Sequence, residues 1–336
     1  MVHLLARRTL FTAAGAALLG LSVLAPSIAA AQAPAAPQKL TVRFTWKLKG
    51  EYAPLFVALD KGYYKAEGLD IDLAEGSGAQ TVFKLLASGA EKVGYGPAIA
   101  VAQAVSAGLP IKVVSVYQSR TPMGVISFPN MPLKTPKDLE GKSIAISVGE
   151  TFGDMLKPFT ATNGVDFDKI KKVQMESSAR TSQFLNRNID VMSVYLSNEL
   201  PQLEKRTGVT FNVLKVSDFG MNLLGASLIV SNDFAAKEPE TLRKLLRATA
   251  KGYADAMKDP AMAAATMAKY MKVPEQPDVL QKQVEATVVS TNAPAGKPIG
   301  WQSEDDWKGN LQLLKDTGAI TAVKPLTDYF TNEFAN

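Results

Sequence analysis

The chain has 336 residues, of which 46% are hydrophobic and 21% are charged, and its formal net charge is +5. This composition is typical of a globular protein with a large core and unlike that of a disordered or membrane-embedded chain. The chain contains no cysteine, and its one histidine is His3. Nucleophilic centres that need His or Cys, and zinc sites built on thiolate or imidazole, are therefore excluded beyond that residue. Catalysis by carboxylates alone stays open.

Residues 1–33 have the pattern of a secretory signal peptide. Arg7 and Arg8 precede an uncharged apolar run that ends at Pro26, and the small residues that follow offer cleavage sites of the A-x-A type. A membrane anchor is the alternative, but the run is shorter than the roughly 20 residues that a spanning helix needs. We expect cleavage after Ala33 and export to the periplasm by the general or the twin-arginine route. Because there is no cysteine to carry a lipid, we expect no lipid anchor.

The remaining chain is only mildly basic. Removal of residues 1–33 takes away two arginines and no acidic residue, so the formal charge falls from +5 to +3. The densest basic run, Lys-Ile-Lys-Lys at 169–172, is typical of a solvated surface. We therefore expect no nucleic-acid partner.

Beyond a Pro- and Ala-rich spacer, short β-rich runs alternate with helical patterns, which is typical of an α/β fold with mostly parallel strands. In the first part of the chain, the alternation predicts strands at 40–46, 69–73 and 111–116. Helices are predicted to end at three glycines, Gly62, Gly89 and Gly108. Ser77 and Gln80 have the spacing of a capping box at the start of the second of these helices.

A second α/β unit is predicted to begin near Gly124. Its predicted strands are 143–147, 191–195 and 211–216. Thr151 is expected to cap a helix that runs to Asn163, and the apolar run 223–230 predicts a buried strand that returns the chain to the first unit. The rest of the chain has helical patterns near 240–258, 261–270, 279–290 and 304–316. In the last of these, Ser303 is the predicted cap and Trp307 lies on the apolar face.

These patterns predict two lobes, each a mostly parallel sheet flanked by helices, joined by two crossover hinge segments. Lobe I would comprise 38–124 and 229–336, and lobe II would comprise 125–228. Ligands of open α/β sheets bind at the carboxyl ends of the strands, often against helix N-termini. A cleft between two lobes gathers such ends from both sides and can close about a hinge.

Several runs resemble the periplasmic solute-binding proteins for thiamine precursors, riboflavin, alkylsulfonates, taurine and nitrate. The resemblance begins in Trp-Lys-Leu-Lys-Gly-Glu-Tyr-Ala-Pro-Leu-Phe-Val-Ala at 46–58 and continues in the segments 61–64, 67–70 and 76–78. Tyr-Leu-Ser-Asn-Glu at 195–199 and Phe-Thr-Asn-Glu-Phe at 330–334 resemble the pyrimidine and flavin branch more specifically. The similarity covers nearly the whole chain beyond residue 33, in the expected order.

The resemblance implies a bilobal type II periplasmic binding fold and a monomer that needs no cofactor. It also implies a small-molecule ligand, and an ABC permease and ATPase as partners. A fungal pyrimidine synthase of thiamine biosynthesis resembles these binding proteins in fold, but it depends on an active-site histidine and a cysteine-rich iron-binding motif. This chain has neither beyond His3, so the resemblance favours binding without catalysis.

Trp46 and Tyr52 are the candidate aromatic contacts. Trp46 ends the first predicted strand, where its face could stack on a planar ligand, and the alternative is a core tryptophan that covers the strand end. Tyr52 follows in the adjacent loop, with packing at the cleft rim as its alternative. Lys47 follows Trp46 where some relatives place an acid or a polar amide, so the charge of the ligand stays open.

Two segments ahead of helices are candidate polar contacts. Ser77 and Gly78 combine a hydroxyl with flexible backbone at a helix start, which suits a carbonyl or an anion, and a plain helix cap is the alternative. Gly149, Glu150 and Thr151 are the counterpart in lobe II. Thr151 is again either a ligand contact or a cap, and Glu150 is either in the cleft or solvated.

Tyr195, Asn198 and Glu199 are the sharpest candidates. They lie where the strand 191–195 meets the next helix. A carboxylate and an amide suit the amino group and ring nitrogens of a pyrimidine, and a tyrosine suits its face. In the branch that this chain resembles, the glutamate at the position of Glu199 contacts the heterocycle. The alternatives are an N-cap for Asn198 and a favourable helix-dipole position for Glu199. Weaker candidates, expected near the hinge and the rim, are Asp218, Phe219 and Trp301.

We expect a periplasmic solute-binding component of an ABC importer that captures a small planar nitrogen heterocycle, such as a thiamine-precursor pyrimidine or a flavin. One alternative is a binding protein for an alkylsulfonate, taurine, nitrate or an aromatic acid. Others are an enzyme of pyrimidine biosynthesis and the partner of a sensor domain. The sequence leaves open the identity and affinity of the ligand, the export route and cleavage position, and the choice between transport and sensing.

Overall fold

A computed structural model describes residues 36–147, 150–291 and 294–335. The predicted signal peptide lies outside these residues, and the described chain forms a unit that starts at residue 36. Within the described ranges, no helix is both long enough and apolar enough to cross a membrane.

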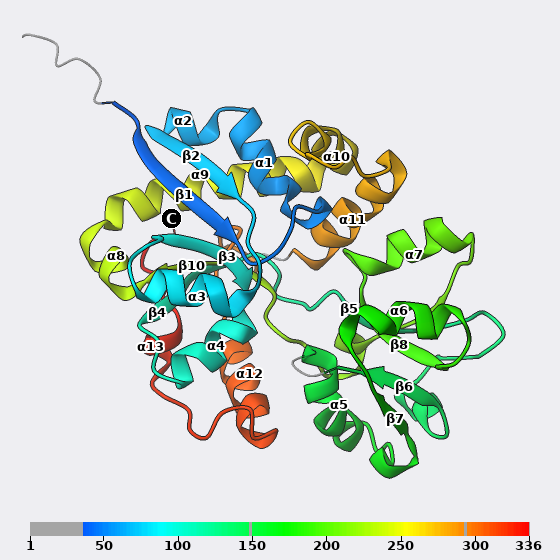
Figure 1. Ribbon diagram of the computed structural model, residues 1–336. Helices are drawn as coiled ribbons and strands as arrows, with labels where there is room; N and C mark the ends of the chain where they lie inside the picture. Colours follow the sequence, from blue (N-terminus) through cyan, green and yellow to red (C-terminus); the bar gives the residue numbers. More distant parts are fainter. Residues whose placement is uncertain (1–35, 148–149, 292–293, 336) are drawn as a thin grey trace, which may run out of the picture. The chain divides into compact units, whose positions relative to one another are not determined.

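The first sheet has five strands in the order β2-β1-β3-β10-β4 (Figure 1). β1 pairs in parallel with β2 and β3, whereas β10 runs antiparallel to β3 and β4. The strand bounds are Gln38–Phe44 for β1, Leu69–Ala74 for β2, Val93–Pro97 for β3, Ile111–Val116 for β4 and Ala226–Ser231 for β10.

The second sheet repeats this arrangement in the order β7-β6-β8-β5-β9. β6 is parallel to β7 and β8, and β5 is antiparallel to β8 and β9. The strand bounds are Met123–Ser127 for β5, Ser143–Ile146 for β6, Lys171–Gln174 for β7, Val191–Tyr195 for β8 and Asn212–Lys215 for β9. In each sheet, the antiparallel strand is the first one formed after the chain crosses from the other sheet. The predicted two-lobed, mostly parallel α/β fold is confirmed.

Helices cover both sheets. The α-helices are α1 Ala53–Asp60, α2 Tyr63–Ala66, α3 Ala79–Ala87, α4 Ala98–Ser106, α5 Thr151–Thr162, α6 Ser177–Leu185, α7 Glu199–Thr207, α8 Asn232–Lys237, α9 Pro239–Lys258, α10 Pro260–Ala268, α11 Pro277–Ser290, α12 Glu304–Asp316 and α13 Leu326–Tyr329. Short 3-10 turns are η1 Gly50–Tyr52, η2 Pro136–Leu139, η3 Phe167–Lys169 and η4 Val216–Phe219.

The hydrophobic core around the first sheet has two parts, one on each face, because the side chains of each strand point alternately to the two faces. In β4, Val113 packs with α4 and α12, whereas the next residue, Val114, packs with α1 and α9. β10 divides Ile229 and Val230 in the same way, because successive side chains of a strand point to opposite faces. Because helices cover both faces, every residue of β4 except Lys112 and every residue of β10 except Ala226 is buried.

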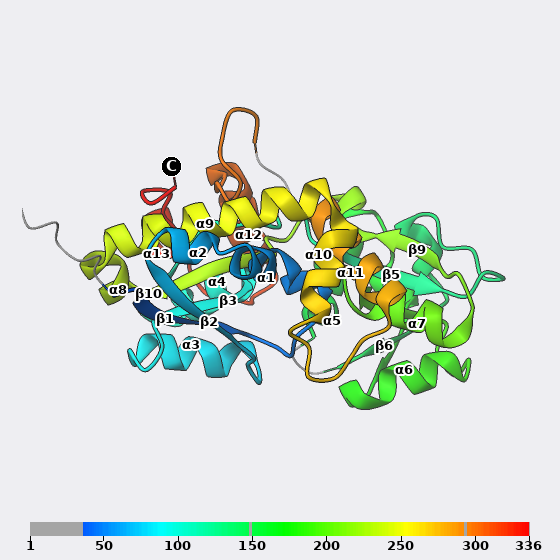
Figure 2. The ribbon, with the colours of Figure 1, turned by 90° about the horizontal axis from the view of Figure 1, so that it is seen from above.

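The long helix α9 lies across the same face as α1 (Figure 2). A Cβ at Gly252 would lie 2.2 Å from the carbonyl oxygen of Pro54, so glycine is what lets α9 approach α1 this closely. Tyr253, next to it, is fully buried. The contact holds the start of α1, and with it the preceding loop, against the first sheet.

We propose that the two lobes follow the two sheets, close to the predicted 38–124 with 229–336 for lobe I and 125–228 for lobe II. Because β10 begins at Ala226, the proposed return boundary moves from 229 to 226. Below, lobe I and lobe II denote the parts built on the first and the second sheet.

Local predictions were mostly confirmed, but two helix caps were wrong. Ser303 caps α12 as predicted, by accepting from the amide of Asp306. Ser77 does not cap α3, since the N-cap is Gly78 with φ +140°, a conformation that favours glycine. Thr151 is the first residue of α5 rather than its cap, and no side chain caps that helix.

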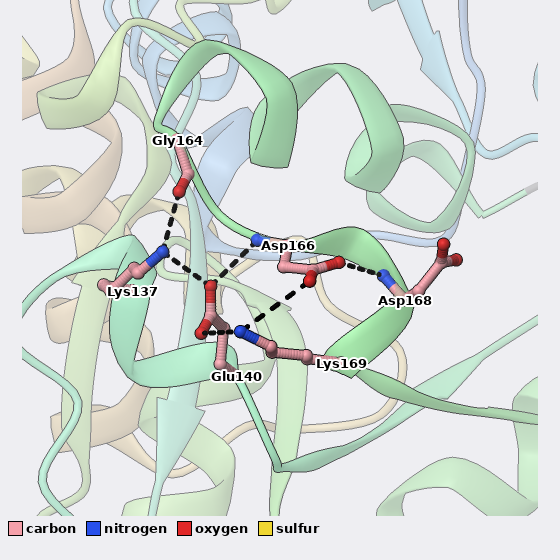
Figure 3. A network of polar contacts seen from close by, with 6 residues as sticks. All are labelled: Lys137, Glu140, Gly164, Asp166, Asp168 and Lys169. Carbon is pink, nitrogen blue, oxygen red and sulfur yellow. Dashed lines mark hydrogen bonds and ion pairs between the residues drawn. The ribbon is translucent and has the colours of Figure 1, made fainter.

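In lobe II, a polar network joins η2 to the segment between α5 and β7 (Figure 3). Glu140 accepts from the amide of Asp166 at 2.9 Å and pairs with Lys137 at 2.7 Å and with Lys169 at 3.5 Å. The amide hydrogen bond, and next the Lys137 ammonium, hold the pKa of Glu140 down at about 2. The ionised carboxylate therefore stabilises the folded state above its ordinary pKa of 4.5.

Replacement of Glu140 by Gln should lower the urea midpoint of unfolding at pH 7, because the amide loses both ion pairs. The loss should shrink as the pH falls from 4.5 toward 2, where the native carboxyl becomes protonated as well. Urea titrations at several pH values would check this. Glu285→Gln, at an exposed site on α11, is the control, and a deficit that does not change with pH would contradict the argument.

Candidate ligand-binding site

A cavity of about 450 Å³ is lined by residues of both lobes. From lobe I it receives segments that follow β1 and β3, and from lobe II segments that follow β6 and β8. These are the carboxyl ends of parallel strands, where open α/β sheets place their ligands. We call this space the central cavity.

Trp46 lies two residues beyond the end of β1 and lines the central cavity. Its backbone is fixed because its carbonyl accepts from the amide of Gly76 at 3.2 Å. The side chain is 51% exposed, so it is not the core tryptophan of the alternative reading. An indole in this position offers a face on which a planar molecule can stack.

Tyr52 is buried but still reaches the cavity wall. Its ring stacks on Phe44 with centroids 4.2 Å apart, and the edge of Tyr95 packs against it. Burial, with the neighbouring Glu51 carboxylate, raises the pKa of the Tyr52 phenol. Tyr95 also lines the cavity, and its hydroxyl is hydrogen-bonded to that of Tyr253. This wall of the cavity is therefore aromatic and uncharged.

Asn198 is one of the points where side-chain hydrogen bonds join the two lobes. The Lys49 ammonium donates to Asn198 Oδ1 at 2.6 Å. Gln283 of α11 donates to the carbonyl oxygen of Asn198 at 3.2 Å and accepts from the amide of Gly50 at 3.0 Å. Asn198 precedes α7, but its side chain does not cap that helix. It serves the contact between the lobes instead.

Glu199 and Tyr195 lie together at the cavity, as expected from the sequence. Glu199 accepts from the backbone amide of Tyr195 at 2.8 Å, which fixes the carboxylate in the first turn of α7. Burial raises the pKa of Tyr195 to about 12. Burial also raises the pKa of Glu51, and Glu199 adds to that rise while Lys49 opposes it.

A second buried cluster from lobe II contains Glu150, Arg180 and Ser193. Arg180 donates to the carbonyl oxygen and the hydroxyl of Ser193 at 2.8 and 2.6 Å and pairs with Glu150 at 3.0 Å. The Ser193 hydroxyl donates to the same carboxylate. Burial raises the pKa of Glu150 although Arg180 acts against it. Among the described residues, none accepts from Arg180 Nε, which is buried.

The structure brings together seven of the eight residues selected from the sequence. Those that line the central cavity are Trp46, Tyr52, Gly78, Thr151, Tyr195, Asn198 and Glu199. Ser77 lines a neighbouring cavity instead, because it precedes the N-cap of α3 and is exposed. Gly149 lies outside the described residues. The weaker candidates Asp218, Phe219 and Trp301 are absent from the described lining.

Sequence reasoning missed three charged residues of the lining, Lys49, Glu51 and Arg180. Lys49 and Glu51 lie between the candidates Trp46 and Tyr52 in the sequence, and this closeness could have indicated that they line the cavity. Arg180 lies in a polar helix with no motif around it, and only the pairing of β6 with β8 brings it to the cavity.

The fold and this cavity define the class of the two-lobed periplasmic binding proteins. The structure is similar to that of the periplasmic aliphatic sulphonate binding protein of Escherichia coli, with a TM-score of 0.68, 16% identity, and coverage of 87% of this chain and 91% of that one. Residues 49–263 match the family described as NMT1/THI5 like, and the chain belongs to that family.

Two relatives that align with more than four fifths of the chain are named as binding proteins. A riboflavin-binding protein of Chloroflexus aurantiacus is 29% identical over 307 residues, which cover 88% of this chain and 86% of the relative. A formylaminopyrimidine-binding protein of Halalkalibacterium halodurans is 25% identical, with coverage of 82% and 84%. Relatives named 4-amino-5-hydroxymethyl-2-methylpyrimidine phosphate synthase, such as that of Aspergillus parasiticus, align over about two thirds of the chain.

The raised pKa of Glu51 predicts the effect of neutralising it. As the pH rises above 4.5, Glu51 ionises in the unfolded chain before it ionises in the folded protein, so the free energy of unfolding falls. Above the raised pKa the carboxyl is ionised in both states, and the loss of stability stays constant. In the ligand-free protein, Glu51→Gln should therefore raise the melting temperature at pH 7 and have little effect below pH 4.5.

Calorimetric melting curves across this pH range would check the prediction, with Glu285→Gln at an exposed site as the matched control. A variant that is less stable at pH 7 would show that the ionised Glu51 is stabilised by its neighbours more than burial penalises it.

Proposed function

We propose that this protein is the solute-binding component of an ABC importer and that its central cavity captures an uncharged planar nitrogen heterocycle of the flavin or pyrimidine type. One observation carries the proposal: the half-exposed face of Trp46 and the hydrogen-bonding groups of Glu51, Asn198 and Glu199 line the same cavity.

Each of these groups suits one part of such a ring. The indole of Trp46 stacks on the ring plane. The carboxylates of Glu51 and Glu199 accept from ring N–H or amino groups, and the side-chain amide of Asn198 donates to a ring carbonyl. A volume of about 450 Å³ lies in the range of cavities that enclose small ligands. The two binding-protein relatives are named for riboflavin and formylaminopyrimidine, and both of these ligands have this chemistry.

The charges of the cavity favour a neutral guest over a sulfonate. Three carboxylates line it, those of Glu51, Glu150 and Glu199, together with two bases. Both bases are engaged, Lys49 with Asn198 and Arg180 with Glu150. An anion specialist would need converging bases free of carboxylates. The similarity to the sulphonate-binding protein, at 16% identity, concerns the fold and gives no information about the ligand.

We propose binding without turnover. The chain has no cysteine and only His3, so it lacks the residue types on which the fungal pyrimidine synthases of the family depend. No group of His, Asp and Glu among the described residues could hold a metal ion. Two relatives that align with more than four fifths of the chain are also named as binding proteins.

We propose that the protein acts in the periplasm after removal of residues 1–33, as a monomer without a lipid anchor or cofactor. It would deliver its ligand to a permease and ATPase at the inner membrane. Closure of the two lobes over the ligand would present the form that the permease recognises.

Equilibrium binding to riboflavin and formylaminopyrimidine, after unfolding and refolding to remove carried-over ligand, tests the proposal. We expect saturable binding of one of them. Trp46→Ala and Glu199→Gln should each weaken it by about tenfold or more, since each removes a direct contact.

Matched controls are Trp301→Ala, a tryptophan outside the central cavity, and Glu285→Gln, a glutamate at an exposed site of α11. Neither should change the affinity. Binding of alkylsulfonates alone would overturn the heterocycle, and conversion of a bound heterocycle to a product would overturn binding without turnover.

A further inference from the structure

A second cavity of about 450 Å³ adjoins the central one. The two share five lining residues, which are Gly78, Ala79, Pro97, Ile99 and Thr151. The second cavity extends from there between the starts of α3 and α5, with α4 and Leu314 of α12 along its walls. We call it the outer chamber. A guest in the central cavity can therefore extend past the shared residues into further enclosed space.

Two of the residues shared by the cavities, Gly78 and Ala79, have small side chains or none. A Cβ at Gly78 would meet no atom within 4 Å, and the backbone there has φ +140°, so the position is open and suited to glycine. Ala79 is the first residue of α3, and no side chain caps that helix. The first backbone amides of α3, next to the residues that the two cavities share, therefore have no capping side chain.

The outer chamber differs from the central cavity in its chemistry. Its polar lining consists largely of neutral hydroxyl and amide groups, those of Ser77, Gln80, Thr81, Gln103 and Thr151. Among the described residues that line it, the single charged one is Asp154, and no tyrosine or tryptophan is present. Alkyl groups of Ile99, Ala100, Met155 and Leu314 complete the wall.

Resting on the proposed function, we propose that the outer chamber holds an uncharged, hydroxylated side chain of the ligand, so that the substrate class is a heterocycle with a polyol tail and without a phosphate. Hydroxyl groups donate and accept in turn, and the amides and hydroxyls of the wall do the same. The apolar groups cover the carbon chain between them.

A phosphate at the end of that tail would be disfavoured. It would need bases to replace its hydration, and the described lining of the outer chamber contains none. It would also come close to the carboxylate of Asp154 in the first turn of α5. Like charges in a partly enclosed space repel each other strongly because water screens them poorly.

Three flavins separate the parts of this proposal. Riboflavin has the ring and the ribityl tail, lumiflavin has the ring with a methyl group in place of the tail, and flavin mononucleotide adds a terminal phosphate. Titration of the refolded protein, followed by flavin fluorescence, should show riboflavin binding about tenfold or more tightly than either of the others.

Gln80→Trp, which fills the outer chamber, should remove the advantage of riboflavin and leave lumiflavin unchanged. Gln281→Trp, at an exposed site of α11, is the matched control and should change neither. Asp154→Asn should narrow the gap between flavin mononucleotide and riboflavin, whereas Asp168→Asn, at a surface aspartate elsewhere in lobe II, should not.

The outcomes distinguish the two proposals. If riboflavin and lumiflavin bind equally well and Gln80→Trp has no effect, the tail site is overturned while heterocycle binding stands. If a pyrimidine binds and no flavin does, the ligand is a single ring and the tail site is again overturned. If no heterocycle binds, both proposals fail.

Discussion

The buried side-chain amide of Gln283 holds together two segments from different lobes, one at Gly50 and the other at Asn198. Its oxygen accepts from the amide of Gly50 and its nitrogen donates to the carbonyl of Asn198. The side chain of Gln283 is fully buried. A Cβ at position 50 would lie 2.6 Å from the Cβ of Gln283, so glycine is what lets the two segments approach this closely. An unpaired buried amide costs about 1–3 kcal/mol, which makes both bonds obligatory. The loop that carries Trp46 and the start of α7 are thereby placed across the cavity from each other.

The ion pairs nearby contribute less to this placement. Lys205 pairs with Asp278 at 2.7 Å and Lys282 with Glu204 at 3.5 Å, each joining α7 to α11. These lysines are about half exposed, and pairs of this kind are worth roughly 0–1 kcal/mol and are screened by salt. The relative position of the lobes thus depends on the buried amide of Gln283 and on the hydrogen bond from Lys49 to Asn198. The surface ion pairs add a weak attraction that can be broken when the lobes move apart.

Periodicity predicted most strands of the fold, but it missed two buried ones, β3 and β5, which are short and contain glycine. The strand β4 was predicted with its bounds, since it is apolar on both faces. β7 and α6 were missed, because β7 is an edge strand with largely exposed residues and α6 has a polar composition. At the site, Trp46 and Glu199 follow from position at strand ends. Arg180 and Gln283 do not, because their roles arise only from how distant segments pack.

The distribution of charge in the site explains how one fold can serve different solutes. Helix starts and strand ends of both lobes offer amides to a guest, and a sulphonate-binding protein of 16% identity has the same fold. In this chain the same space contains Glu51, Glu150 and Glu199, and its two bases are occupied by protein groups. A guest therefore gains nothing from a net negative charge, and it gains most from N–H groups, carbonyls and a flat face. The fold decides where a solute binds, and the charges already paired within the lining decide which solute it is.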